Sequence, residues 1–234
     1  MALYAIGDPH LSRAQPKPMD IFGPAWTDHA ARFFANWRRV VRDDDAVLVP
    51  GDISWAMTLP EALPDLEDID ALPGRKFLIP GNHDYWWEAI GRVRKQHLPS
   101  MTFVQNDHAM WGEVAVCGTR LWLPPGDRNW AEDPAHNARV WARELQRLQL
   151  SLSSALQAGA QDIVVMLHYP PVDERQNDTE ATRRLAATPG VRDVVYGHLH
   201  GYQERPVFSG EHGGVRYRLV ACDYIDFTPV LIRP

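Results

Sequence analysis

The sequence predicts an α/β fold, because short buried strands alternate along it with amphipathic helices. Apolar runs of a few residues recur along the chain, at 3–6, 46–49, 77–79, 163–167 and 194–196. Continuous runs of this kind are typical of strands that are buried on both faces, as in a mostly parallel sheet. Helical patterns lie between the runs, and this alternation predicts βαβ units.

Two segments have the apolar periodicity of helices. The first is expected to begin after Thr27, a good N-cap residue. The second is expected to open with Asp133 and Pro134 and to end at Gly159, since proline is favoured at the first helical position and glycine beyond the last one. The apolar stripes consist of Ala30, Phe33, Phe34, Trp37, Val40 and Val41 in the first helix and of Trp141, Leu145, Leu148, Leu152 and Leu156 in the second.

Additional strands are expected at 112–118, 215–222 and 228–232, with turns between them. They suggest a second, more antiparallel sheet that packs on the first. The chain has no internal repeat and no low-complexity linker, and its 234 residues suit one large α/β unit. We therefore expect a single domain over residues 1–234.

The composition is that of a globular protein, with 45% hydrophobic and 23% charged residues. Cys117 and Cys222 lie inside apolar runs, which predicts buried free thiols and fits a reducing compartment. The N-terminus lacks the features of a signal peptide, and no run approaches the ~18 apolar residues of a membrane span. We therefore expect a cytoplasmic protein that does not contact a membrane; the sequence does not indicate an oligomeric state.

The charge balance disfavours long nucleic acid as a partner. The net charge is −6, from 24 Lys and Arg against 30 Asp and Glu, and the basic residues form no block. Broad electrostatic binding to a polyanion needs the opposite balance. A small phosphorylated substrate remains compatible, because a metal site supplies positive charge locally.

Polar side chains follow five of the apolar runs, in the tight turns where the predicted strands end. In open α/β sheets, functional groups gather just beyond these ends. The carboxylate, amide and imidazole groups there, with no thiolate, favour Mn, Fe, Zn or Co over a pure Ca or Mg site. Their number suits two ions that share a ligand, and such pairs activate water for attack on a phosphoryl centre. The candidate ligands are Asp8, His10, Asp52, Asn82, His168, His198 and His200.

The motifs Asp8-Pro-His10, Gly51-Asp52, Gly81-Asn-His-Asp84, His168 and Gly197-His-Leu-His200 resemble, in this order, those of the calcineurin-like metallophosphoesterases. The resemblance implies a four-layer α/β/β/α sandwich of two mixed sheets flanked by helices. It implies that a hydroxide bridging two metal ions hydrolyses a phosphoester. The expected ions are divalent or trivalent, with Mn²⁺ preferred and Fe, Zn or Co as alternatives.

The resemblance also implies a role for each residue. Asp8, His10, Asp52 and His200 would hold the first ion. Asp52 would bridge to the second ion, which Asn82, His168 and His198 would complete. His83 would act as general acid toward the leaving oxygen, and Asp84 would orient its ring. Trp55 departs from the family pattern, which often has an acid or glycine there, and the loop after Asp52 is therefore expected to pack differently.

Substrate choice is expected to depend on aromatic loops near these motifs. Trp55 and the run 85–87 directly follow ligand loops. These aromatic residues are expected to pack over the segment after Asp84, and the alternative is that they stack on a substrate. Residues 121–133 resemble a lid or substrate loop. Arg120, Arg128 and Arg175 are interpreted as surface charge, with phosphate contact as the alternative. These loops slightly favour a phosphodiesterase, on a small and possibly nucleotide-sized substrate, over a phosphatase.

Two other functions compete with this prediction. One is a nuclease that acts on short nucleic acid, against which the acidic balance argues. The other is a non-catalytic scaffold with the same fold, and the retained His83 argues against that role.

Overall fold

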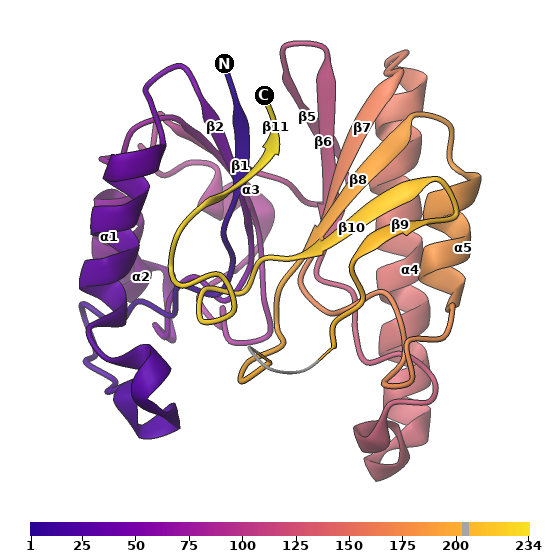
Figure 1. Cartoon of the computed structure of the whole chain (residues 1–234), viewed down its shortest axis with the longest axis horizontal. Coiled ribbons are helices and arrows are strands. Elements are labelled where there is room, and N and C mark those ends of the chain that lie inside the picture. The colour runs from indigo at the N-terminus through magenta and orange to yellow at the C-terminus, as the bar shows by residue number, and fades with distance from the viewer. Residues whose placement is uncertain (203–205) are drawn as a thin grey trace.

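The computed structural model describes residues 1–202 and 206–234. Two mixed sheets face each other, and helices cover the outer face of each one, so that the layers follow the order α/β/β/α (Figure 1). The termini lie near each other at one end of the sandwich (Figure 1). The predicted four-layer α/β/β/α fold of two mixed sheets is confirmed.

The first sheet contains three of the strands that precede ligand motifs. Its order is β11 (Val230–Arg233), β1 (Leu3–Ala5), β2 (Ala46–Pro50), β3 (Arg75–Ile79) and β4 (Met101–Phe103). These strands run parallel, except β11, which is antiparallel to β1 at the edge. The register Leu48↔Phe77 and Val49↔Leu78 brings the ends of β2 and β3 side by side.

The second sheet contains the other two motif strands. Its order is β5 (His108–Trp111), β6 (Val114–Thr119), β7 (Asp162–Leu167), β8 (Val191–Tyr196), β10 (Val215–Leu219) and β9 (Gly210–His212). Its inner four strands are parallel, and only the edge strands β5 and β9 pair antiparallel. The second sheet has two antiparallel pairs against one in the first, so it is the more antiparallel of the two as expected, but the strand expected at 228–232 is β11 of the first sheet. Helices link β6 to β7 and β7 to β8, and such crossovers produce parallel neighbours.

Helices α1 (His29–Val40), α2 (Leu59–Asp70) and α3 (Ile90–Val93) belong to the first half of the chain, and α4 (Pro134–Gln157) and α5 (Glu180–Ala187) to the second. Asp133 caps α4 as predicted, because its side chain accepts a hydrogen bond from the backbone N–H of His136. The predicted cap at Thr27 is wrong by one residue. Asp28 precedes α1 with a φ of 52°, and Thr27 instead closes a short 3-10 helix.

The apolar core has three layers, one between the two sheets and one between each sheet and its helices. Alternate residues of β2 show this: Leu48 faces the opposite sheet, together with Phe77, Val164 and Val195. Its neighbours Val47 and Val49 face α1 and α2, where Trp37 is fully buried. Both cysteines are buried free thiols, as predicted. Because the central strands β2, β3, β7 and β8 are buried on both faces over most of their length, their ends keep fixed relative positions.

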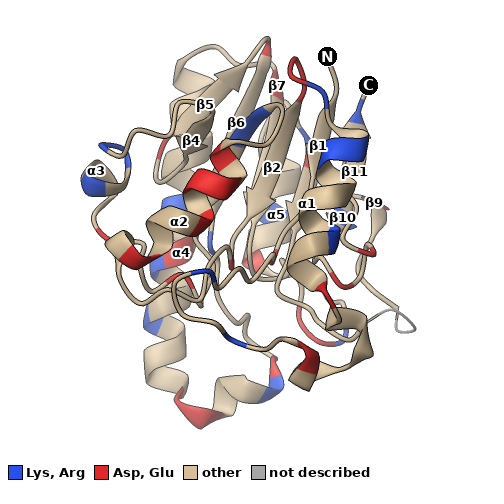
Figure 2. Cartoon of the chain, turned by 90° about the vertical axis from the view of Figure 1, so that its left-hand side faces the viewer, with Lys and Arg blue, Asp and Glu red and all other residues tan. Residues whose placement is uncertain are grey.

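Charged residues are mixed over the surface. In the view of Figure 2, segments with Lys or Arg alternate with segments with Asp or Glu on the helices and loops, without one extended basic face. Among the described residues, no helix is long and apolar enough to cross a membrane.

Candidate metal centre

The turns after the five motif strands converge at one end of the sandwich. Four of the predicted ligands, Asp8, His10, Asp52 and His198, have left-handed backbone conformations, with φ of 57°, 47°, 50° and 71°. This conformation costs a residue with a Cβ roughly 1–2 kcal/mol. Backbone strain of this kind concentrates at functional sites, where the surrounding structure enforces it.

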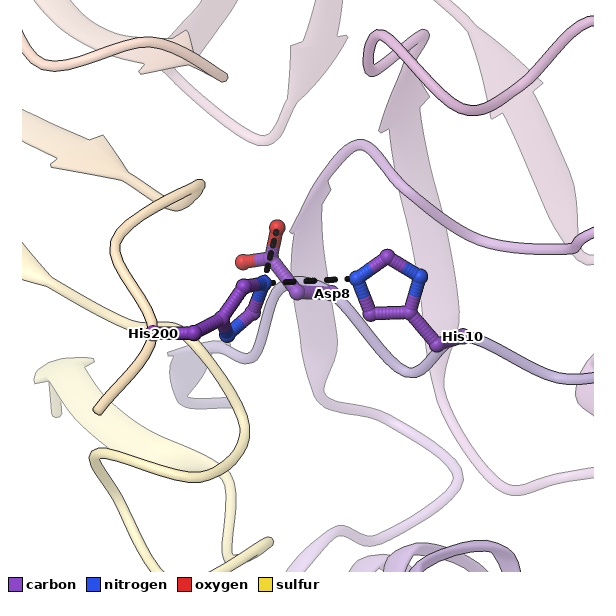
Figure 3. Close-up of side chains that lie close together, drawn as sticks. All are labelled: Asp8, His10 and His200. Carbon is purple, nitrogen blue, oxygen red and sulfur yellow. Dashed lines mark hydrogen bonds and ion pairs between the residues drawn. The ribbon is translucent and has the colours of Figure 1, made fainter. Parts of the chain in front are cut away.

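One group of side chains comprises Asp8, His10 and His200 (Figure 3). The Nε2 atoms of His10 and His200 are 3.3 Å apart, and the His200 Nε2 lies 3.9 Å from Asp8 Oδ1. Asp8 is fully buried, and its Oδ2 atom has no hydrogen-bond partner among the described residues. Nitrogen and oxygen atoms whose lone pairs face one another at this distance can coordinate a cation between them.

A second group comprises Asp52, His168 and His198. Burial lowers the pKa of His168 to about 3, so its ring is neutral and carries a single N–H. Its Nδ1 lies 3.0 Å from the carbonyl oxygen of Pro50 and donates that hydrogen bond. The lone pair on Nε2 then faces Asn82 Oδ1 at 2.7 Å and Asp52 Oδ2 at 3.5 Å.

The Asp52 carboxylate lies between the two groups. Its Oδ2 atom is 3.6 Å from His10 Nε2 and 3.5 Å from His168 Nε2. Its Oδ1 atom accepts a hydrogen bond from the backbone N–H of His83 at 2.8 Å. One oxygen of Asp52 therefore faces a nitrogen of each group.

The electrostatics of the centre suit bound cations. Burial lowers the pKa of His10 and His198 well below the usual value, which keeps both rings neutral and able to coordinate. Burial also raises the pKa of the Asp8 and Asp52 carboxyls. A positive ion between these buried carboxylates offsets the cost of their charge. The oxygen and nitrogen donors present fit two metal ions.

Glycine is required at two motif positions, because the backbone there lies too close to a candidate ligand to leave room for a Cβ atom. A Cβ on Gly81 would lie 2.1 Å from Asp52 Oδ1, and a Cβ on Gly197 would lie 2.3 Å from Asp8 Oδ2. Both distances are shorter than real Cβ contacts allow. The glycines in these two motifs therefore let a backbone pass directly against a candidate ligand.

His83 lies at the centre, but Asp84 does not contact its ring. The Nδ1 atom of His83 is buried without a hydrogen-bond partner among the described residues. The Asp84 carboxylate instead accepts hydrogen bonds from the backbone N–H groups of Ile53, Ser54 and Gly81 and from the indole of Trp86. The buried Asp84 carboxylate thus links the second motif loop to the third, and no hydrogen bond from Asp84 orients the His83 ring.

Asp223 belongs to the centre and was not predicted from the sequence. Its Oδ1 atom lies 2.8 Å from Nδ1 of His200, and its Oδ2 accepts the backbone N–H of Gly201 at 2.8 Å. Burial alone lowers the pKa of His200, but this hydrogen bond and the nearby carboxylates raise it overall. Asp223 follows the apolar run 219–222, so the same sequence signal that marked the other motifs, an apolar run followed by a polar ligand, was present here too.

Tryptophan residues beside the motifs pack in the core or against the motif histidines. Trp86 is fully buried, and Trp87 donates a hydrogen bond to Gln105, in agreement with the predicted packing role, whereas Tyr85 is 57% exposed and departs from it. Trp55 stacks on the His10 ring with centroids 4.8 Å apart, and its ring lies 4.4 Å from that of His83. The residue that departs from the family pattern therefore packs against a candidate ligand and the candidate acid.

The three arginines have different surroundings. Arg128, in the 3-10 helix Arg128–Glu132 of the loop 121–133, pairs with Glu174. The Arg120 guanidinium lies 4.9 Å from the ring centroid of Trp122, and its Nε atom is buried without a partner among the described residues. The backbone N–H of Arg175 donates to Asp173, and its side chain is exposed. Of the three, Arg120 lies nearest the centre, since its charge acts on Asp52 and His168.

The calcineurin-like phosphoesterase family matches residues 1–202. The chain belongs to this family. Among solved structures, a phosphopantetheinyl hydrolase (PptH) from Mycobacterium tuberculosis is 17% identical and covers 100% of this chain and 96% of its own, with a TM-score of 0.57. A protein of unknown function from Aquifex aeolicus, AQ665, is 14% identical over 98% of this chain and 95% of its own, with a TM-score of 0.43. No curated protein matches the chain.

Proposed function

We propose that this calcineurin-like phosphoesterase hydrolyses a small phosphorylated substrate with the help of two metal ions. The position of Asp52 carries the proposal, because its Oδ2 atom faces His10 at 3.6 Å and His168 at 3.5 Å. A carboxylate oxygen that faces an imidazole nitrogen of each group is what a shared ligand of two ions requires. Membership of the family supports the same reaction class.

In this proposal Asp8, His10 and His200 hold the first ion, and Asn82, His168 and His198 the second, with Asp52 shared. Paired ions would supply an activated water and neutralise charge on the phosphoryl group. The ions are proposed to be Mn²⁺, with Fe, Zn or Co as alternatives, because the donors are oxygen and nitrogen without sulfur.

His83 is proposed to protonate the leaving oxygen. Burial lowers the pKa of its imidazole, and the Asp52 carboxylate acts in the opposite direction. An anionic phosphoester bound against the ring would also raise this pKa, because a nearby negative charge favours the protonated form. The proton is therefore available once the substrate is bound.

We favour a phosphodiester over a monoester as substrate, because cavities flank the centre on both sides. One of about 490 Å³ adjoins His10, His83 and His200. Another of about 260 Å³ adjoins His198 and Tyr169 and is bordered by the loop 121–133. A diester, such as one of nucleotide size, has a substituent for each cavity.

The test is hydrolysis of bis-p-nitrophenyl phosphate and p-nitrophenyl phosphate by the purified protein with Mn²⁺, Fe²⁺, Zn²⁺ or Co²⁺. His83→Ala should lower kcat by about 10²-fold or more, the usual contribution of a general acid. The exposed His97, replaced by alanine, serves as the matched control and should retain wild-type turnover. Absence of turnover with every ion, or full activity in His83→Ala, would contradict the proposal.

Two alternatives have distinct signatures. A non-catalytic scaffold would retain far fewer than two ions per chain after supplementation. A nuclease on short nucleic acid would show binding that falls steeply with ionic strength. The mixed surface charge argues against long nucleic acid as a substrate (Figure 2). We also propose that residues 1–234 form one domain, which the apolar layer shared by both sheets supports, and that this domain is cytoplasmic.

A further inference from the structure

The cavity beside the first group has a strongly apolar lining. It measures about 490 Å³, within the range of pockets that bind small molecules. The rings of His10, His83 and His200 border it where it meets the centre. Its remaining walls include Met19, Phe22, Pro24, Ala25, Trp26 and Trp55.

The aromatic side chains that line the cavity are held in place by contacts with neighbouring residues. Trp26 is 4% exposed, and its ring meets His10 and His200 edge-on at centroid distances of 5.7 and 5.2 Å. The indole N–H of Trp55 points to the sulfur of Met19 at 3.2 Å, and the Lys17 ammonium lies 3.1 Å from the Trp55 ring centroid. The cavity is therefore preformed.

The segment that builds the cavity lies between the first motif and α1. It contains two 3-10 helices, η1 (Asp20–Phe22) and η2 (Pro24–Trp26), which Gly23 joins with a φ of 126°. Phe22 lines the cavity and is nevertheless 58% exposed, whereas the adjacent Ile21, which is 69% exposed, is not part of the lining. Large apolar side chains exposed at the mouth of a pocket indicate that a ligand covers them.

We propose that this cavity receives the leaving group of the phosphoester, and that this group is aromatic or otherwise apolar and uncharged. The inference rests on the proposed function. His83, which is proposed to protonate the leaving oxygen, borders the same cavity, so the group attached to that oxygen lies inside it. In the reaction the ester P–O bond breaks, an oxygen from water bonds to phosphorus, and the leaving oxygen takes the proton of His83. The attacking water releases a proton to solvent, and solvent returns one to His83.

The product released into the cavity is then a neutral alcohol or phenol. Among the described lining residues, no Lys or Arg is present to bind a charged group, and the carboxylate of Asp223 is paired with His200. A leaving group with further phosphates would meet an apolar wall and lose its hydration without compensation. The lining thus selects an uncharged group.

The experiment compares phenyl and 2-naphthyl phosphates, and their methyl diesters, which differ in apolar area but little in the acidity of the leaving group. We expect kcat/KM to be about tenfold higher for the naphthyl esters, from the apolar surface that the second ring buries. Phe22→Ala should lower this naphthyl-to-phenyl ratio severalfold. Ile21→Ala, the neighbouring exposed residue outside the cavity, is the matched control and should leave the ratio unchanged.

A binding measurement provides a readout apart from turnover. Calorimetry should detect 2-naphthol binding to the protein without added metal, and Ala25→Phe, which fills the cavity, should abolish it. A ratio near one in the wild type, or a ratio equally insensitive to Phe22→Ala and Ile21→Ala, would overturn the assignment while the proposed hydrolysis stands. Absence of hydrolysis of every ester with every ion would instead overturn the proposed function and the leaving-group role with it.

Discussion

Replacing Asp223 by alanine should weaken binding of the first metal ion and leave the second in place. The Asp223 side chain is 1% exposed, and its Oδ1 atom accepts a hydrogen bond from Nδ1 of His200 at 2.8 Å. This bond fixes the orientation of the ring and directs Nε2 toward Asp8 and His10. The substitution frees the His200 ring to rotate. It also removes the negative charge that makes Nε2 a stronger electron-pair donor to the metal ion.

The size of the effect follows from this one contact. A hydrogen bond to a charged partner contributes about 1.5–3 kcal/mol. At 1.4 kcal/mol per factor of ten, this corresponds to a loss of roughly 10- to 150-fold in affinity for the first ion. Because His168 takes its orientation from the Pro50 carbonyl instead, the second ion should keep its affinity.

The assay is calorimetric titration of the metal-free protein with Mn²⁺ at mildly alkaline pH, together with metal analysis after dialysis. Asp226→Ala is the matched control, since it removes the same charge nearby from a side chain that is 87% exposed and paired with Arg32. Two ions bound to Asp223→Ala with wild-type affinities would refute the reasoning. Equal losses of metal affinity in both variants would also refute it, because they would show that removal of a nearby negative charge, and not the hydrogen bond to His200, causes the loss.

Three further outcomes are expected. Gly197→Ala should reduce metal content by about one ion per chain, because the new Cβ would lie 2.3 Å from Asp8 Oδ2 and displace it; metal analysis checks this. Leu148→Ala should lower the free energy of unfolding in urea by about 2–5 kcal/mol, since Leu148 is fully buried between α4 and the second sheet. Burial lowers the pKa of Lys76 from 10.5 to about 8, so the unfolded chain binds more protons between these pH values. The free energy of unfolding of the wild type should therefore rise over this range relative to Lys76→Met, by up to about 3 kcal/mol; parallel pH profiles would contradict this.

Elements with a strong local signal were predicted well. The strands β2, β3, β7 and β8 each contain a continuous apolar run, and α4 has both a capping residue and a long apolar stripe. Helix α2 was not predicted; Pro64 lies inside it. Its start depends on a capping box between Thr58 and Glu61, a short-range device that an apolar pattern does not reveal.

The sequence by itself determined the family, the order of the motifs and the donor atoms, because each motif is a short run of residues after a strand. The tertiary structure decided which donors meet. Parallel strands from two different sheets place Asp52 between His10 and His168, and the chain brings Asp223 to His200 from a strand end near the C-terminus. It also placed Asp84 against the backbone of residues 53 and 54 instead of His83. Such contacts join residues far apart in sequence, and their distances depend on sheet packing, which no local pattern encodes.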